Sequence, residues 1–433
     1  MFHRRNPAPK LAAAILAASL LFVTGCGASA SASDEPEGTA ENPVTVRFAW
    51  WGNDSRAKTT LEVIKKFEEE NPGIKVKGES SEYGSYWDKM ATQVAGGNMP
   101  DLISTGGAYT SEYSSRGALL DLATVKDEID TSKFVEGTVE LGQIDGTQYA
   151  ITAGVNSMAM ALNPAVFQAA GVELPDDNTW TWDDYTELAT KISEGSPAGT
   201  FGTTPNANET FLSIWARQSG EQLYADDGKS LAISEDRVSE WMQLNVDLLK
   251  SGKSLSASQF VEDGSAQSEQ SLMGQGKQGM KIVWSSQLGS YPVEGLTIAK
   301  MPGESPKGGN WLRSGLEYAI SSKTEHPKAT AKFLSYLVNS VGAGELVKSD
   351  KGMPANVEVR AAIKPLLSEN QSKEAAYLDR VGEMNLTPPR PDPAGSSATL
   401  EVLNRNLTDV LFEKATVQEG AKKFIEEVNQ NLL

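Results

Sequence analysis

The sequence predicts an α/β protein built on mainly parallel sheets, and three observations support this class. The chain has 433 residues, enough for two domains. Residues 44–50, 74–80 and 100–105 have the composition and patterning of short strands. Amphipathic segments with helical spacing separate them. A strand–helix–strand order at this spacing is typical of βαβ units, in which the strands are parallel.

The first helix is predicted over residues 57–70. Asp54 or Ser55 can cap its N-terminus. One helical face carries apolar side chains at Ala57, Leu61, Ile64 and Phe67. The Asn-Pro-Gly sequence at 71–73 ends this helix, because proline cannot continue a helix and glycine accepts a left-handed turn. A second helix is predicted from residue 86 to the glycines at 96 and 97.

The alternation of strands and helices continues to the C-terminus. One helix begins after a Thr181 cap, and another runs from a Ser234 cap to a stop at Gly252. Later strands are predicted over 280–284, 294–301 and 316–322. Three helices close the chain, over 327–339, 400–415 and 417–433.

The chain is strongly acidic, with a formal net charge of −18 and a pI near 4.7. Nucleic-acid binding needs a concentrated surface of lysine and arginine. We therefore exclude nucleic acid, an anionic membrane face and a polyanionic ligand as the main partner. The acidity itself indicates a soluble, self-repelling surface.

Residues 1–25 have the organisation of a bacterial export signal. Arg4, Arg5 and Lys10 form a basic region, and residues 11–23 form an apolar run too short to span a bilayer. Val-Thr-Gly-Cys follows and ends at Cys26, the one cysteine of the chain. This stretch resembles the lipobox of bacterial lipoproteins. The resemblance implies cleavage before Cys26, diacylglycerol on its thiol and a further acyl chain such as palmitate.

Two or three acyl chains hold a protein on a membrane where one chain does not. Residues 26–43 are small, acidic and interrupted by proline, a composition that predicts a flexible tether. We therefore expect the protein on the outer face of the bacterial cytoplasmic membrane, either extracellular or periplasmic, held there by its lipid.

The sequence offers little for catalysis. After removal of the signal, His326 is the one histidine left, and no Gly-x-Ser-x-Gly elbow accompanies it. Zinc sites of histidine and cysteine are excluded, and no calcium-loop pattern is present. With 57 acidic residues, a pair of carboxylates at glycosidase spacing stays open.

Eight stretches in order along the chain carry a resemblance to a known family. They are FEEENPGIKV (67–76), YWDKMATQVAGGNMPDLIS (86–104), SSRGALLDL (114–122), DGTQYAITAGVNSMAMALNPAVFQAAGVELP (145–175), TWTWDDYTELA (179–189), GQGKQGMKIVWSS (274–286), YAISSKTEHPKATAKFLSYLVNS (318–340) and KGMPAN (351–356). The chain resembles the family 1 extracellular solute-binding proteins of carbohydrate ABC importers, the class of maltose-binding protein. It departs from the family pattern at Ala161, where an aromatic residue is usual.

The resemblance implies two α/β lobes, each a mainly parallel sheet flanked by helices, joined by a multi-strand hinge. The N-terminal lobe would hold residues 44–155 plus 314–360, and the C-terminal lobe residues 156–313 plus 361–433. The ligand would lie in the cleft between the lobes, which close on it by hinge rotation. The implied function is capture of an oligosaccharide and its delivery to the permease subunits of an ABC importer. We expect a monomer, no chemistry, no cofactor and no metal.

Candidate ligand contacts follow from the chemistry of a sugar. An indole stacks on the apolar face of the ring, and planar polar side chains bind the hydroxyl groups. In open α/β sheets, ligands lie beyond the carboxyl ends of the strands. Candidates from the first lobe are Trp50, Trp51, Asn53, Asp54, Arg56, Glu82, Tyr83, Trp87, Thr105, Tyr109 and, on the first crossover, Asn156. One of the two adjacent indoles is expected to pack in the core, because neighbouring strand residues face opposite sides.

The second lobe and its crossover supply the other candidates. They are Asn208, Glu209, Phe211, Trp215, Trp284, Trp311 and Arg313, with Arg390 and Asp392 at the rim. Trp180, Trp182 and Trp241 are assigned to structure.

Two alternative functions stay open. One is a secreted glycoside hydrolase. The other is a receptor for a different solute, for example ferric iron bound by the tyrosines at 83, 86, 109 and 113.

Overall fold

The computed structural model describes residues 38–250, 255–304, 308–384 and 386–432. The predicted signal and Cys26 lie outside these residues, as does most of the predicted tether. Residues 38–43 are described: Gly38 lies against Gly73, and residues 39–43 are exposed. Thr39 and Asn42 exchange two backbone hydrogen bonds of 3.1 Å. At Gly38 a Cβ would come within 2.3 Å of the carbonyl oxygen of Gly73. The flexible tether predicted over residues 26–43 stays a prediction.

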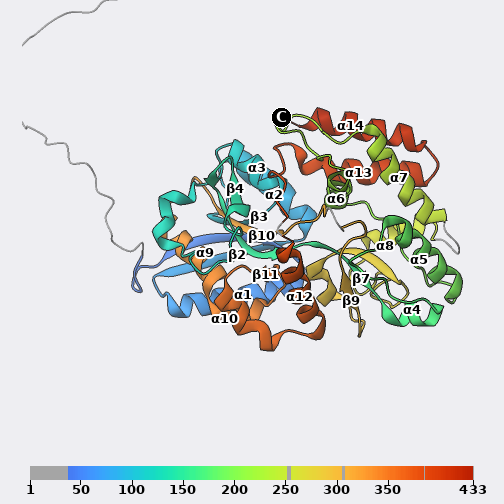
Figure 1. Cartoon of the computed structure of the whole chain (residues 1–433). Helices are drawn as coiled ribbons and strands as arrows, with labels where there is room; N and C mark the ends of the chain where they lie inside the picture. Colours follow the sequence, from blue (N-terminus) through green and yellow to red (C-terminus); the bar gives the residue numbers. More distant parts are fainter. Residues whose placement is uncertain (1–37, 251–254, 305–307, 385, 433) are drawn as a thin grey trace, which may run out of the picture. The chain divides into compact units, whose positions relative to one another are not determined.

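A six-stranded mixed sheet contains all three strands predicted at the N-terminus (Figure 1). Its order is β11 (Met353–Pro354), β6 (Ala150–Asn156), β10 (Arg313–Ile320), β3 (Leu102–Thr105), β1 (Val44–Trp51) and β2 (Ile74–Ser81). β1 is parallel to both β2 and β3. The other three pairs are antiparallel. The prediction of a mainly parallel sheet is therefore wrong beyond the first three strands.

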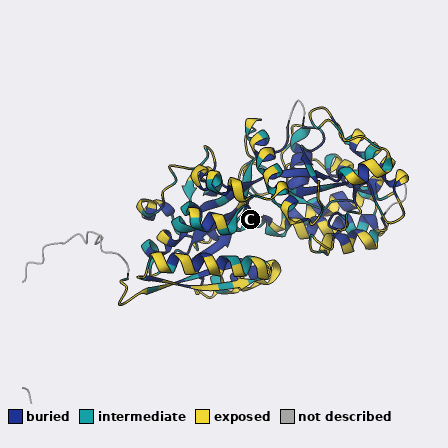
Figure 2. Ribbon diagram, turned by 90° about the horizontal axis from the view of Figure 1, so that it is seen from below, coloured by how far each residue is buried: buried dark blue, intermediate teal, exposed yellow. Residues whose placement is uncertain are grey.

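Alternation along the strands assigns their side chains to two cores. Phe48 and Trp50 on β1 face the core under α1 (Asp54–Glu70) and α9 (Pro327–Asn339). Ala49 belongs to the opposite core, with residues of α2 (Tyr83–Ala95) and α3 (Ala108–Ser115). Trp51 points to that second side. Figure 2 shows these strands as buried, with exposed residues on the outer faces of the helices.

A second sheet has three strands and is wholly antiparallel. Its order is β8 (Met280–Trp284), β7 (Met158–Leu162) and β9 (Thr297–Ala299). The predicted parallel character is wrong here too. Period-two patterning indicates a strand but not its direction. The direction is set by long helical connections, which return β8 and β9 opposite to β7.

The remaining elements surround these sheets. The helices are α4 (Pro164–Ala170), α5 (Trp182–Gly195), α6 (Glu209–Gln218), α7 (Glu235–Lys250), α8 (Ala257–Ser265), α10 (Val341–Val347), α11 (Val357–Ile363), α12 (Glu369–Glu383), α13 (Thr399–Leu411) and α14 (Val417–Asn431). Short 3₁₀ segments are η1 (Leu122–Glu128), η2 (Glu140–Gly142), η3 (Ser285–Ser290), η4 (Lys364–Leu366) and η5 (Ser396–Ala398), and a small hairpin joins β4 (Gln143–Ile144) to β5 (Thr147–Gln148). None of the helices among the described residues is long and apolar enough to cross a membrane.

The chain passes from one sheet to the other at two neighbouring places. β6 ends at Asn156 and β7 begins at Met158, so Ser157 alone connects strands of different sheets. β10 begins at Arg313, directly opposite Asn156 in the strand register. The side chain of Asn156 accepts hydrogen bonds from Ser157 N and Ser285 Oγ, at 3.0 and 2.6 Å. The two crossings are thereby joined to each other and to the end of β8.

Helix caps mostly follow the sequence. Thr181 and Asp184 form the capping box of α5, and Ser234 Oγ accepts from Arg237 N at the start of α7. The first helix differs, because Asn53 caps α1 by accepting from Arg56 N at 3.0 Å. The predicted caps Asp54 and Ser55 lie inside the helix.

Glu374 on α12 is a buried acid. It is 0% exposed, and among the described residues the hydroxyl of Ser349 is the group that favours its charged form. Burial disfavours the charged form and raises its pKa to about 7. Between the ordinary value of 4.5 and about 7, the folded state holds the proton more tightly than the unfolded state. Stability should therefore fall as pH rises through this window.

We expect Glu374→Gln to increase the free energy of unfolding above pH 7 by up to about 3 kcal/mol, because the amide carries no charge to bury. The gain should vanish as pH falls toward 4.5, where the native carboxyl is already protonated. Urea unfolding at several pH values measures it. Glu426→Gln, at an exposed position of α14, is the matched control. An equal gain at all pH values would contradict this account.

Candidate functional site

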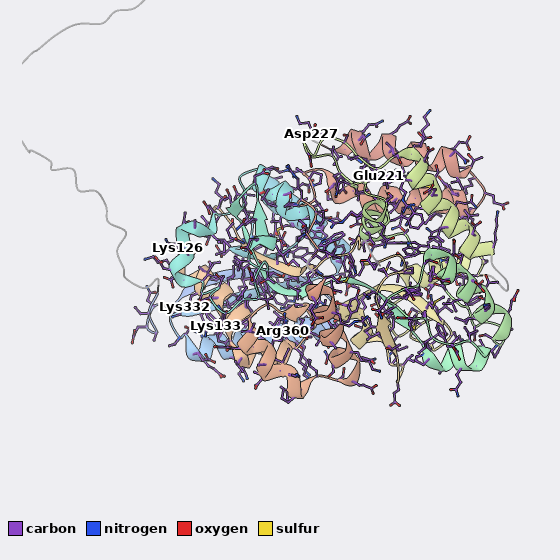
Figure 3. The ribbon with its side chains drawn as sticks, in the orientation of Figure 1. Lys126, Lys133, Glu221, Asp227, Lys332 and Arg360 are labelled. Atoms are coloured by element: carbon purple, nitrogen blue, oxygen red, sulfur yellow. The ribbon has the colours of Figure 1, made fainter. Side chains whose placement is uncertain are left out.

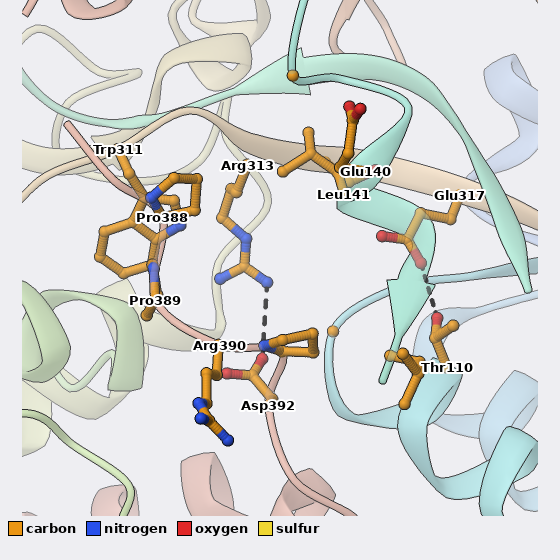
Figure 4. A pocket seen from close by; sticks show the side chains of 15 residues that line it. Thr110, Glu140, Leu141, Trp311, Arg313, Glu317, Pro388, Pro389, Arg390 and Asp392 are labelled. Atoms are coloured by element: carbon orange, nitrogen blue, oxygen red, sulfur yellow. Dashed lines mark hydrogen bonds and ion pairs between the residues drawn. The ribbon is translucent and has the colours of Figure 1, made fainter. Parts of the chain in front are cut away.

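Two adjoining cavities lie where α3, η2, β10 and the segment 388–392 come together. The smaller has a volume of about 210 Å³ and is lined by Thr110, Leu141, Trp311 and Glu317, among others (Figure 4). The larger, about 900 Å³, shares Glu140, Ile144 and the segment 388–392 with it and extends along residues 222–228. The two have these lining residues in common, so they lie side by side.

Arg313 is the central cation of this site. Its Nη1 donates to Thr210 Oγ1 at 2.7 Å, and its Nη2 lies 3.9 Å from Asp392 Oδ2. Its guanidinium carbon lies 5.0 Å from the centre of the Trp284 ring. Arg313 therefore connects β10 with α6, with the end of β8 and with the segment 388–392. The structure brings together three predicted residues here, Trp284, Arg313 and Asp392.

Glu317 is a buried acid on the same strand as Arg313. Its side chain accepts a 2.7 Å hydrogen bond from Thr110 Oγ1, whose oxygen lies 3.2 Å from Thr105 Oγ1. Burial raises the pKa of Glu317 to about 7, although Thr110 and Arg313 favour its charged form. Neither Glu317 nor Thr110 was predicted. A charged residue inside the apolar segment 316–320 was the signal that could have identified Glu317.

Glu209 and Asp392 add two more carboxylates near Arg313. Burial raises the pKa of each, and Asp392 raises that of Glu209 further by charge repulsion, while Arg313 lowers both. Oε2 of Glu209 is buried without a hydrogen-bond partner among the described residues. Glu209 was predicted as a ligand contact, and it opens α6 beside Thr210.

An aromatic cluster lies at the carboxyl ends of β1 and β3. Trp87 and Tyr109 stack with parallel rings, 3.4 Å between centroids and 3° between planes. The ring centroid of Trp51 lies 5.6 Å from that of Tyr83 and 5.4 Å from that of Trp87. Tyr83 is 53% exposed, and the charges of Glu209 and Arg313 act on its phenol. Trp51, Tyr83, Trp87 and Tyr109, all predicted, thus form one group that faces the start of α6.

Trp311 lines the smaller cavity although it is 7% exposed. The guanidinium of Arg217 covers one face of its ring, 5.0 Å from the centroid. A separate cavity of about 330 Å³ is lined by Asn208 and Trp284 on the side of the three-stranded sheet. The ion pair of Lys281 with Asp263, at 2.8 Å, lies in its wall.

Two predicted aromatic contacts, Phe211 and Trp215, are wrong because their rings pack in cores, and Trp50 is the one of the two adjacent indoles that was expected to do so. Trp50 is 1% exposed and lies against Phe48. Phe211 stacks on Trp182, with 5.1 Å between ring centroids. Trp215 lies under Arg237, and its Nε1 donates to the backbone of that residue. Strand and helix periodicity directs these rings inward. Trp180 and Trp241 are also buried and Trp182 packs against the same core, as predicted.

Several polar residues that were predicted to contact the ligand instead form hydrogen bonds or an ion pair within the protein. Asn53 and Asn208 cap helices α1 and α6. Arg56 binds Asp350, with Nε 2.7 Å from Oδ2. Asn156 bonds to residues at both ends of the crossing, as described above. Asp54 and Glu82 are exposed at helix N-termini, and nothing in the structure joins them to the cavities.

We expect Thr110→Val to raise the pKa of Glu317 by about one unit, because the charged carboxylate loses a hydrogen-bond donor. Thr110→Ser, which keeps the hydroxyl, should leave it near the native value of about 7. Infrared titration of the carboxyl band, with Glu317→Gln to assign it, measures the shift. Equal titration of the Val and Ser variants would contradict the role given to this bond.

Comparison with known proteins identifies the family. The family model described as bacterial extracellular solute-binding protein matches residues 62–375. Diacetylchitobiose binding protein DasA of Streptomyces coelicolor is 24% identical over 443 residues, covering 98% of each chain.

Two solved structures share the fold. One is a periplasmic oligogalacturonide binding protein of Yersinia enterocolitica in complex with saturated digalacturonic acid, with a TM-score of 0.78, 19% identity and coverage of 89% of this chain and 98% of that one. The other is an ABC substrate-binding protein of Listeria monocytogenes in complex with cycloalternan, with a TM-score of 0.75, 21% identity and coverage of 90% and 99%. The chain belongs to the bacterial extracellular solute-binding proteins, a family that binds solutes and is not enzymatic.

Proposed function

We propose that this protein captures an oligosaccharide in the two adjoining cavities around Arg313 and delivers it to the permease subunits of an ABC importer. The observation that carries the proposal is a cavity of about 900 Å³ beside one of about 210 Å³, with lining residues in common and with planar polar groups and an aromatic ring in their walls. The relatives named above are described as binding diacetylchitobiose, digalacturonic acid and cycloalternan. These names support a carbohydrate ligand.

The residues of the site suit a sugar chemically. Tyr83 offers an exposed ring beside Trp51, and Trp311 offers a ring edge in the cavity wall. Stacking on such rings favours the apolar face of a sugar. Arg313, Glu209 and Asp392 supply planar donors and acceptors for hydroxyl groups. An unpaired buried polar group costs about 1–3 kcal/mol, so these groups should decide which sugar fits.

We further propose that the two sheets belong to two lobes that close on the ligand. The lobes would keep the predicted boundaries, 44–155 plus 314–360 and 156–313 plus 361–433. Two of the three boundaries lie at residues that face each other in the strand register, Asn156 and Arg313, which suits a rotation about an axis near them; the third lies at 360/361. The permease would recognise the closed arrangement. Lipidation at Cys26 would keep a monomeric protein on the outer face of the cytoplasmic membrane.

The hydrolase alternative is excluded by membership of a non-enzymatic family. The iron alternative is disfavoured by the state of the tyrosines. Burial raises the pKa of Tyr83, Tyr86 and Tyr109, and that of Tyr113 to about 12, the opposite of what a phenolate ligand needs. No group of three or more histidine, cysteine, aspartate or glutamate residues able to hold a metal occurs among the described residues.

We expect Trp311→Ala to weaken oligosaccharide binding by more than about tenfold, because this ring lines the smaller cavity and a buried aromatic contact is worth a few kcal/mol. Titration calorimetry against a panel of oligosaccharides measures the affinities. Phe412→Ala is the control: this ring is 40% exposed at the end of α13, and neither cavity includes it. If no glycan binds the native protein, or if Trp311→Ala binds as the native protein does, the proposal fails.

A further inference from the structure

The walls of the two cavities carry more negative than positive charge. Their lining residues include six carboxylates and three guanidiniums, and no lysine or histidine. The carboxylates are those of Glu140, Asp145, Asp226, Asp227, Glu317 and Asp392. Glu209 adds a seventh beside Arg313. The excess of negative charge therefore lies in the residues that line the cavities.

The three arginines of the walls already have partners. Arg313 is engaged by Thr210 and Asp392. Arg217 donates to the carbonyl of Thr387 at 2.6 Å and covers Trp311. Arg390 donates to the carbonyl of Asp226 at 2.9 Å and pairs with its carboxylate at 3.6 Å. An anionic ligand would have to compete for each of these guanidiniums.

Glu317 lies deepest among the acids of the smaller cavity, at 4% exposure. One of its oxygens accepts the hydrogen bond from Thr110, and Figure 4 shows the other directed away from Thr110, toward the side of the cavity that holds Arg313. The groups that face Glu317 are Thr110 on α3, Arg313 on its own strand and Asp392 in the segment 388–392, with Glu140 of η2 in the same wall. Asp392 and Glu140 repel a second negative charge here.

Lysines that could offset this charge lie elsewhere. Lys126, Lys133 and Lys332 stand together on the side of the body that carries η1 and α9, whereas Asp227 lies at the outer end of the larger cavity (Figure 3). Glu209, Glu317 and Asp392 share the guanidinium of Arg313, so their buried negative charge is only partly compensated, which is costly. A ligand that brings a cation would remove this cost, and a ligand that brings a carboxylate would increase it.

We infer that the captured oligosaccharide carries a protonated amino group, which the carboxylates of Glu317, Glu209 and Asp392 receive. This inference rests on the proposed function and adds the chemical class of its ligand, an amino sugar. An ammonium offers three donors, and charge-assisted hydrogen bonds to carboxylates are about twice as strong as neutral ones. The same charges exclude uronic acids.

Binding is linked to the proton on Glu317. The pKa of its carboxyl is raised by burial to about 7, so near neutral pH part of the free protein holds a proton there. A bound ammonium favours the carboxylate and releases that proton. The preference for the amine should therefore weaken as pH falls below about 7.

The test compares sets of oligomers of equal length and linkage: glucosamine oligomers, their N-acetylated counterparts, glucose oligomers and galacturonic acid oligomers. Titration calorimetry should give the tightest binding for a glucosamine oligomer, by about tenfold or more over its N-acetylated and hydroxyl counterparts. If a neutral or acidic oligomer binds as tightly as its amine counterpart, the inference is overturned while the proposed function stands. If no oligomer binds, the proposed function falls and the inference with it.

Glu317→Gln keeps the shape of the side chain and removes its charge. We expect this variant to lose the amine preference by about tenfold, with the neutral counterpart changed by less than about threefold. Glu374→Gln is the matched control, because it removes a second buried acid, on α12, that lines neither cavity. Glu209→Gln provides an independent test if Glu317→Gln folds poorly, as judged by circular dichroism.

Proton release is read from the dependence of the binding enthalpy on the ionisation enthalpy of the buffer. Release should occur with the native protein and with Glu374→Gln, and disappear in Glu317→Gln. Retention of both the amine preference and the proton release in Glu317→Gln and Glu209→Gln would overturn the assignment of the ammonium to these carboxylates.

Discussion

A single guanidinium holds together the elements around the cavities. Arg313 starts β10, yet its side chain reaches α6, the end of β8 and the segment 388–392. Because arginine stays charged in proteins, it stabilises the charged form of the carboxylates near it. Glu209 and Asp392 share this one cation, and each is raised in pKa by its burial. The arrangement of the site thus follows from the need to compensate buried charge.

The aromatic residues divide into two populations with different tasks. Trp50, Phe211, Trp215 and Trp241 are enclosed in the cores and stabilise the sheets and helices on which the site is built. Tyr83 and Trp311 stand at the boundary between protein and cavity, and Trp51, Trp87 and Tyr109 support Tyr83 from behind. A rigid stack behind an exposed ring keeps that ring in one orientation, which lowers the entropic cost of stacking on a ligand.

Periodicity along the chain was sufficient for most elements of this fold. The strands at 44–51, 74–81 and 280–284 and the caps at Thr181 and Ser234 follow from local sequence alone, because alternation and capping are short-range effects. Strand direction could not be predicted, since it depends on how long connections return. The sequence indicated that Trp50 and Trp51 face opposite sides, but the inward side is decided by α1 and α9, which cover it from distant positions.

The candidate site was predictable in part for similar reasons. Trp284 ends β8, Trp311 lies just before β10, Arg313 begins β10, and Glu209 opens α6; at such element ends a side chain can face a ligand. Glu317 was missed because it lies within a strand, and its role depends on Thr110, more than two hundred residues away in the chain. Long-range pairs of this kind form only in the tertiary fold, so the local sequence pattern does not indicate them.

The register that sets Asn156 opposite Arg313 has a mechanical consequence. If the two sheets swing as proposed, the backbone torsions that change belong to Ser157 and Leu312, and strand pairing keeps these pivots side by side. A residue at the pivot is nearly stationary during such a swing, while distant loops sweep through a wide arc. Arg313 would therefore keep nearly the same position in the open and closed forms. Residues far from the hinge, such as Asp227, would move farthest.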